Sequence, residues 1–322
     1  MSNPEENPSE VLCETHPGRG VQVLEPREVP LGGPRAMNVR RTLPQRSRSL
    51  IGGWCFVDHY GPATTRMLVP PHPHTGLQTV SWLFAGDIEH RDSVGSLAAV
   101  RPGELNLMTA GSGISHSEVS PSTPTVLHGA QLWVALPEVH RHTAPAFENF
   151  VPTPFTRQGA TISVFIGQLG GASSPARVFS PLLGAQLDIP AGRTLSLSVN
   201  SDFEHGVLVD AGEVTVANVT IPTNHLAYLA PGLTELVITA TTDARLLLLG
   251  GEPLGEPLGE PIIMWCNFIG RSHDEIVDFR AQWQRDVIEG GNPEGRFGTV
   301  ADYDGHPLPA PQLPTVRLKP RD

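Results

Sequence analysis

Residues 69–95 read VPPHPHTGLQTVSWLFAGDIEHRDSVG, and residues 101–118 read RPGELNLMTAGSGISHSE. The ligand-type side chains in these stretches form two pairs at the spacing i, i+2: His72 with His74, and His116 with Glu118. On an extended strand, alternate side chains lie on the same face. Two such strands brought together across a barrel would offer three imidazoles and one carboxylate to a single point. The sequence therefore predicts a metal site inside a β-barrel.

The predicted donor set limits the choice of metal. Imidazole with carboxylate suits Fe(II), Ni, Mn, Cu, Co or Zn, whereas Ca and Mg prefer shells made of oxygen. Four protein ligands leave room on an octahedral metal for water or a substrate, which a catalytic site needs. One HxH alone is weak evidence, but two pairs beside glycine-rich turns favour a site. We expect one divalent metal.

The rest of the chain indicates β-structure. Its 322 residues are 39% hydrophobic and only 17% charged, with 33 Gly and 32 Pro, a balance that favours short strands joined by tight turns. The expected strands are residues 53–58, 77–84, 105–109, 128–136, 161–168, 182–189, 194–199, 206–209, 213–219, 226–229, 235–239 and 244–249. Many short strands at this spacing predict sandwiches or barrels.

One helix is expected, over residues 272–288. Ser272 has the character of an N-cap, because acidic residues follow it in the first turn. Apolar side chains then recur at helical spacing at Ile276, Phe279, Trp283 and Val287. The preceding repeat GEPLGEPLGEP, residues 251–261, contains too much proline for a helix and is expected to be an extended linker.

The Pro- and His-rich stretch 137–154 is the expected domain junction. The predicted domains are residues 1–140, which hold the metal, and residues 141–322, which include the helix and an extended Pro-rich tail. Residues 1–17 are polar and are expected to be mobile.

Charge and cysteine content limit the function. The net charge of -11 argues against direct nucleic-acid binding. There is a local cluster of five arginines, Arg35, Arg40, Arg41, Arg46 and Arg48. The favoured interpretation is that they pair with acidic loops. The alternative is that they form an anion or partner site. The cysteines Cys13, Cys55 and Cys266 are sparse, which suits a reducing compartment. With no leader-like or membrane-spanning stretch, we expect a cytoplasmic monomer.

The two metal motifs resemble those of the cupin superfamily, and of the pirin family in particular. Pirins carry an HPHxGxET-type segment, matched here by His72 to Thr79, and then a PGD-xxxMTAG-xGIxHsE-type segment, matched by Pro102 to Glu118. Further matches are RRTLPQ (40–45), FVDHYGP (56–62), HGAQLWVALP (128–137), PIIMWCNFIGRSHDEI (261–276) and GRFG (295–298). The resemblance covers most of the chain.

The resemblance implies an all-β fold of two stacked antiparallel cupin barrels (double-stranded β-helix, or jelly roll) with one C-terminal helix. It also implies one metal, usually iron, in the N-terminal barrel. The implied ligands are His72, His74, His116 and Glu118. The chain departs from many members at Gln78, where they have Glu, and Gln78 is expected to line the pocket. The second barrel is expected to bind no metal, because its histidines have no i, i+2 partners.

Other candidate pocket residues are Asp58, His59 and His90. Asp58 and His59 could orient a ligand or substrate, or could hold a turn at a strand end. His90 follows the first motif and is expected near the cavity mouth. His128 is expected to be structural.

Two functions are implied by the resemblance. Some pirins resemble quercetin 2,3-dioxygenases, in which a flat flavonol loses its enol proton and reacts with O₂, and ring opening expels carbon monoxide. Glu118 would be the general base. The alternative is a metal- or redox-dependent regulator that binds a transcription factor or a metabolic enzyme, with the stretch from Arg35 to Arg48 as the first surface to test. The enzyme interpretation is favoured.

Overall fold

The structure is a computed structural model that describes residues 20–30, 38–121, 123–254 and 261–320. The expected mobile residues 1–17 lie outside this range, as do residues 255–260 of the proposed linker. The described chain is mostly β-strand, with a single α-helix near the C-terminus. All pairings between its named strands are antiparallel except for isolated bridges. The predicted all-β fold class with two barrels is confirmed.

The first barrel consists of a seven-stranded sheet, in the order β12-β9-β6-β11-β4-β3-β2, and a four-stranded sheet, in the order β5-β10-β7-β8. Side chains along these strands alternate between its interior and its outer face. The bounds are β2 Arg27–Pro30, β3 Asn38–Leu43, β4 Trp54–Thr65, β5 Leu68–His74, β6 Leu77–Ala85, β7 Ile88–Asp92, β8 Leu97–Val100, β9 Leu105–Thr109, β10 Ile114–Val119, β11 Thr125–Ala135 and β12 Ala146–Phe150.

The second barrel pairs a seven-stranded sheet, β1-β22-β19-β24-β17-β14-β13, with a four-stranded sheet, β18-β23-β20-β21. Its interior holds a large apolar cluster of Leu, Val, Ile, Ala and Phe side chains. The bounds are β1 Gln22–Leu24, β13 Phe155–Arg157, β14 Ala160–Ile166, β17 Leu182–Ile189, β18 Thr194–Ser198, β19 Glu204–Ala211, β20 Val214–Val216, β21 Val219–Ile221, β22 Leu226–Leu229, β23 Glu235–Ala240 and β24 Ala244–Gly251.

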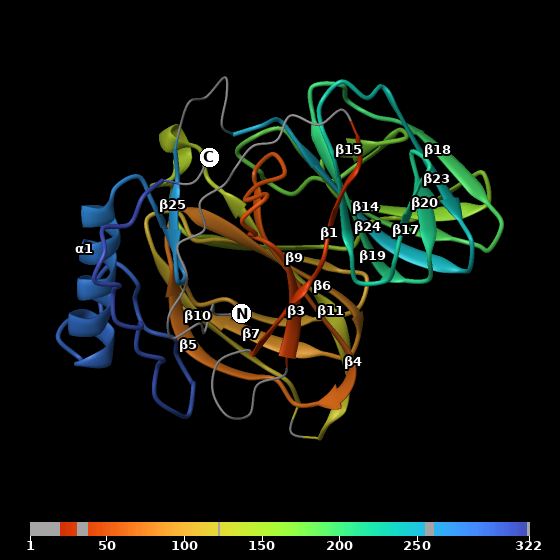
Figure 1. Cartoon of the computed structure of the whole chain (residues 1–322). Helices are drawn as coiled ribbons and strands as arrows, with labels where there is room; N and C mark the ends of the chain where they lie inside the picture. Colours follow the sequence, from red (N-terminus) through yellow and green to blue (C-terminus); the bar gives the residue numbers. More distant parts are fainter. Residues whose placement is uncertain (1–19, 31–37, 122, 255–260, 321–322) are drawn as a thin grey trace.

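The two seven-stranded sheets pack face to face, as Figure 1 shows. Trp82 of the first barrel stacks on Phe165 of the second, with ring centroids 4.5 Å apart. The indole of Trp54 donates a hydrogen bond to the Gly250 carbonyl, 3.1 Å away. Such buried aromatic pairs stabilise an interface beyond the area they bury. The barrels therefore share one continuous apolar layer.

Each end of the described chain lies against the barrel at the opposite end of the sequence. Strand β1 pairs with β22 of the second barrel. After β24 the chain returns to the first barrel, where β25 (Ile263–Trp265) and β26 (Phe268–Gly270) form a hairpin that bridges Thr75. Helix α1 (His273–Trp283) packs on this hairpin and lies at the left of Figure 1. The helix and tail, assigned by sequence to residues 141–322, thus cover the metal-motif barrel.

Helix α1 begins where the sequence predicts. The Ser272 hydroxyl accepts a hydrogen bond from the Glu275 backbone N–H at 3.2 Å. Ile276, Phe279 and Trp283 form the buried face. The expected span to residue 288 is completed by one π-helical turn, Gln284–Ile288.

Replacing Ser272 by alanine should lower the free energy of unfolding by about 1 kcal/mol, because it leaves an N-terminal N–H of the helix without its acceptor. Urea unfolding of both proteins checks this value. An unchanged midpoint would mean that the cap adds nothing. Ser198→Ala, on an exposed edge position of the second barrel, is the matched control.

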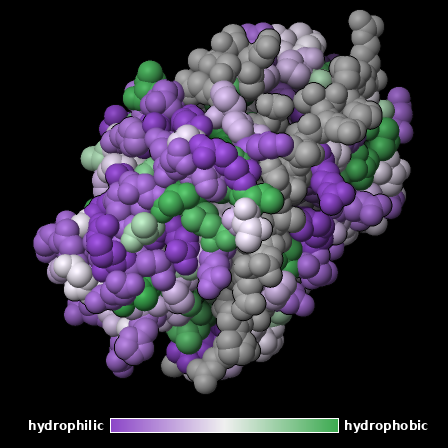
Figure 2. Space-filling view, turned by 60° about the vertical axis from the view of Figure 1, so that its left-hand side comes forward, coloured by the Kyte–Doolittle hydropathy of each residue, from purple (hydrophilic) through white to green (hydrophobic). Residues whose placement is uncertain are grey.

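Hydrophilic side chains dominate the face in Figure 2, and apolar residues there are scattered. Most exposed large apolar side chains of the described residues are isolated valines, such as Val139 and Val316. Single exposed apolar residues are ordinary on a water-facing surface. No helix in the described part of the chain is long and apolar enough to cross a bilayer.

Candidate metal centre

The three motif histidines meet inside the first barrel. Strands β5 and β10 are direct neighbours, and His72 lies opposite His116 in their ladder. The ring centroids of His72 and His116 are 4.3 Å apart, and that of His74 is 5.1 and 5.0 Å from them. One nitrogen of each ring lies within 4.8 Å of the others. The i, i+2 spacing thus places three imidazoles at one point, on adjacent strands.

Burial keeps these imidazoles neutral. The three side chains are at most 1% exposed. Burial lowers the pKa of His72 to about 3, and it holds the pKa values of His74 and His116 well below the ordinary value. A neutral imidazole keeps a lone pair, which is the form that binds a metal.

The nitrogen positions fit a divalent transition metal. Nδ1 of His72 donates to the Pro70 carbonyl at 2.8 Å, so its Nε2 carries the lone pair, and this buried Nε2 has no described partner. Nε2 of His74 faces Nε2 of His116 at 3.1 Å. A cation among these three atoms would bind all of them at once. Three imidazole nitrogens suit Fe, Ni, Cu, Co or Zn better than Mg or Ca.

Glu118 lies on the same strand as His116, beyond a bulge, and is 1% exposed. The Ser81 hydroxyl lies 3.3 Å from its Oε1 and 2.7 Å from Oε1 of Gln131. The Glu118 carboxylate is not in the group of atoms within 4.8 Å of one another. Its role as a fourth ligand therefore stays a prediction.

His90 lies directly behind His116. Nδ1 of His90 is 3.3 Å from Nδ1 of His116, and its Nε2 is 3.1 Å from Oδ2 of Asp92. Although burial raises the pKa of Asp92, hydrogen bonds from His90 and Ser96 bring it below its usual value. The predicted pocket residue His90 therefore contacts His116, one of the three histidines of the candidate metal centre.

The other predicted pocket residues point in different directions. Asp58 faces the interior of the first barrel and accepts two hydrogen bonds from Arg41, at 2.6 and 2.8 Å. His59, its neighbour on β4, points out of the barrel toward Asp210. Gln78 donates to Thr109 and to a backbone carbonyl of residue 177, away from the histidine cluster. The structure brings neither His59 nor Gln78 to the three histidines.

An aromatic wall, which was not among the residues predicted from the sequence, lines the site. The edge of His74 packs on Trp133, with centroids 5.2 Å apart, and Trp133 stacks on Phe56 at 4.0 Å. Tyr60 is fully buried, and burial raises its pKa well above its ordinary value, with a further contribution from the Glu118 charge. Alternation along β4, β6 and β11 could have indicated these interior positions, together with Ser81 and Gln131.

A second histidine cluster lies between the barrels. Nε2 of His59 and Nε2 of His128 lie 2.6 and 2.5 Å from Oδ1 of Asp210, whose Oδ2 accepts from Arg245 at 2.6 Å. Two ligands of one tetrahedral ion would be about 3.3 Å apart, so these are hydrogen-bond distances. Burial raises the pKa of Asp210, but hydrogen bonds from both histidines bring it well below its usual range. We term these four residues the inter-barrel network.

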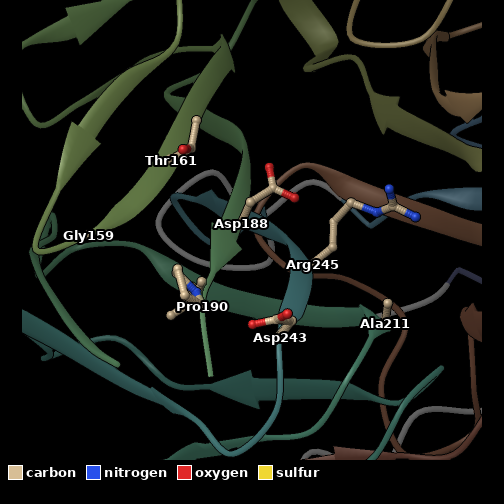
Figure 3. Close-up of a pocket in the computed structure, with 9 residues that line it drawn as sticks. Gly159, Thr161, Asp188, Pro190, Ala211, Asp243 and Arg245 are labelled. Carbon is tan, nitrogen blue, oxygen red and sulfur yellow. The ribbon is translucent and has the colours of Figure 1, made fainter. Parts of the chain in front are cut away.

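A hollow of about 520 Å³ opens beside this network (Figure 3). It lies where β14, β17, β19 and β24 end, and its charged lining residues are Asp188, Asp243 and Arg245. The Arg245 side chain is 29% exposed, so it is the network member that reaches solvent.

Two stacked antiparallel barrels, one holding a buried cluster of three histidines, define a two-domain cupin protein with a candidate metal centre. The pirin family model matches residues 36–134, and the model of the pirin C-terminal cupin domain matches residues 184–289. A "pirin-like protein" of Caulobacter vibrioides is 37% identical over 81% of this chain and 92% of its own length. The chain belongs to the pirin family.

Two further proteins resemble the chain over almost its full length. A Pseudomonas aeruginosa protein named "Putative quercetin 2,3-dioxygenase" is 40% identical over 98% of both chains. A crystal structure of quercetin 2,3-dioxygenase from Acinetobacter baumannii superposes with a TM-score of 0.83 at 37% identity, covering 92% of this chain and 97% of its own.

Proposed function

We propose that the protein is a dioxygenase of the quercetin 2,3-dioxygenase type, dependent on one divalent metal. The observation that carries the proposal is the buried convergence of three neutral imidazoles, whose nitrogens lie within 4.8 Å of one another. The names of the Pseudomonas and Acinetobacter relatives support the reaction class. His72, His74 and His116 would hold the metal, with Glu118 as a fourth ligand and Fe(II) as the first expectation.

Glu118 is suited to remove the enol proton of a flat substrate. When bound, the metal would lower the pKa of a coordinated enol hydroxyl. Glu118 follows His116 by two residues and is buried. The Ser81 hydroxyl orients its Oε1. Its carboxylate would hold the abstracted proton while product forms.

Buried apolar side chains next to the three histidines would orient the substrate and exclude water. Phe56, Trp133, Met108, Leu77 and Ile114 belong to one buried cluster that adjoins the histidines. Flat aromatic rings pack well against such surfaces, and exclusion of water strengthens the polar contacts that remain. This environment supports a small aromatic substrate together with O₂.

Replacing Glu118 by glutamine should lower quercetin turnover under air by about 10²–10⁴-fold while the three histidines still bind metal. Glutamine keeps the shape but cannot accept the proton. Turnover and metal content are measured on the same preparation, with Glu213→Gln, an exposed position of the second barrel, as control. Undiminished turnover by the metal-loaded variant would show that Glu118 is not the base.

Three of the four described arginines of the basic stretch make internal contacts, which weakens the regulatory alternative. Arg41 pairs with buried Asp58, and Arg48 lies over the Tyr228 ring and reaches Glu204. Arg40 donates to the Gly61 carbonyl. Arg41 and Arg48 thus pair with carboxylates, as the interpretation of pairing with acidic loops expects, but Asp58 and Glu204 lie on strands and not in loops. Arg46 is exposed, and Arg35 lies outside the described residues.

A further inference from the structure

His90 and Asp92 are arranged as a chain of contacts that ends on a proposed metal ligand. Strands β7 and β10 are neighbours, with Asp92 opposite His116 and His90 opposite Glu118. Asp92 is 2% and His90 3% exposed. The His90 ring stacks on Phe147 with centroids 4.4 Å apart, which fixes its plane. The order of contacts is Asp92, His90, His116.

The hydrogen bonds of the Asp92 carboxylate determine which ring nitrogen of His90 carries a proton. Oδ1 of Asp92 accepts the backbone N–H groups of Val94 and Ser96, at 3.1 and 2.9 Å. Its Oδ2 can also only accept, so Nε2 of His90, 3.1 Å away, carries a proton and donates it. In its neutral form His90 has this one N–H, so its Nδ1 is then a bare acceptor.

The tautomer of His116 follows from the bare acceptor on His90. Its Nδ1 faces the bare Nδ1 of His90 at 3.3 Å, so the proton of this contact belongs to His116. Nε2 of His116 is then left with its lone pair. That atom is directed toward Nε2 of His74, 3.1 Å away, inside the histidine cluster.

We infer that Asp92 and His90 are positioning residues that order protons along a relay, so that His116 presents the Nε2 lone pair to the metal. This inference rests on the proposed metal-binding function. Partners that fix the second nitrogen of a ligating histidine commonly affect metal affinity by about 10–100-fold. The carboxylate of Asp92 therefore acts on the metal site through two imidazoles.

The variant Asp92→Asn tests the relay because it should reverse the proton order without changing the shape. Its amide oxygen can still accept from Val94 and Ser96, so its NH₂ group faces His90 and can only donate. His90 would then hold its proton on Nδ1, and His116 would hold its proton on Nε2. This proton would occupy the Nε2 position of His116, where the metal requires a lone pair.

The primary measurement is the ¹⁵N chemical shift of both ring nitrogens of His116 in the metal-free full-length protein. Its signals are assigned by comparison with His116→Gln. We expect a protonated Nδ1 in the wild type and a protonated Nε2 in Asp92→Asn. Titration with Ni²⁺ should then show binding weakened about 10–100-fold in the variant.

Two substitutions of His90 separate proton ordering from packing. His90→Gln keeps an acceptor and a donor, so it should stay within a few-fold of wild-type nickel affinity. His90→Phe keeps the stack on Phe147 but removes both nitrogens, and it should resemble Asp92→Asn. Asp243→Asn is the control, because Asp243 is a turn carboxylate of the second barrel that also accepts a backbone N–H, from Ala191.

An unchanged His116 tautomer in Asp92→Asn, or unchanged nickel affinity in both Asp92→Asn and His90→Phe, would overturn the relay. A wild-type protein that shows the expected tautomer yet takes up no nickel would confirm the proton order and defeat the proposed metal function. If the wild type binds nickel but its metal-free form carries the His116 proton on Nε2, the metal function stands and the proton order is wrong.

Discussion

The His72→Ala protein is expected to lose its metal almost completely, whereas the wild type should hold about one ion per chain. The substitution removes one of three converging nitrogens and leaves a space where a buried Nε2 stood. Metal analysis of the purified protein, as isolated and after loading with Fe(II) without air or with Ni²⁺, measures the change. Quercetin turnover should disappear with the metal.

His205→Ala is the matched control for this experiment. His205 is also fully buried, and neither ring nitrogen has a described partner, but it lies on β19 of the second barrel, outside the cluster. Burial lowers the pKa of His205 to about 4, so both substitutions remove a neutral, buried imidazole. Metal retained by His72→Ala, or lost equally in both variants, would contradict the assignment. A wild-type protein that binds no metal would end the metal proposal.

The Asp210→Asn protein is expected to be less stable by about 2 kcal/mol, because a neutral amide replaces a buried carboxylate that accepts a hydrogen bond from the Arg245 guanidinium. An amide oxygen also accepts more weakly than a carboxylate from His59 and His128. Urea unfolding at pH 7.5 measures the loss. Asp188→Asn is the control, because Asp188 is the cross-strand neighbour of Arg245 but lies outside the network. Equal losses in both variants would mean that the network has no special effect.

The same network should make the wild type sensitive to acid. Burial lowers the pKa of His59 below its unfolded value, although Asp210 raises it in part. The unfolded state therefore binds the proton first, and stability falls as the pH drops below about 6.5. The lowered pKa of Asp210 acts in the same direction at more acidic pH. Thermal midpoints between pH 7.5 and 5 should decline, and a flat profile would contradict this account.

Local patterns in the sequence were sufficient for part of the strands and for the convergence of the three histidines, although β5 and β10, which carry these histidines, were not among the predicted strand ranges. The ranges predicted for β9, β17 and β22 match the structure residue for residue, because glycine, proline and asparagine mark the ends of short apolar runs. The i, i+2 spacing placed His72 and His74 on one face. The N-cap and apolar periodicity located α1.

Contacts between strands that are far apart in the sequence could not be predicted, because a local pattern carries no information about which strands become neighbours. His59 meets Asp210 across 151 residues, and neither flanking segment carries a mark of its partner. Asp58 and His59 were taken together as pocket residues, yet adjacent positions on a strand point to opposite faces. The relay from Asp92 through His90 depends on β7 lying beside β10, which is a property of sheet order.

The exchange of chain ends between the barrels has a consequence for how the molecule can be divided. The second barrel needs β1 from the beginning of the described chain, and the first barrel needs the hairpin and helix from its end. A fragment cut at any point between the barrels would leave each half with a missing sheet neighbour or an uncovered wall. The smallest piece that contains a complete metal-motif barrel is therefore nearly the whole chain.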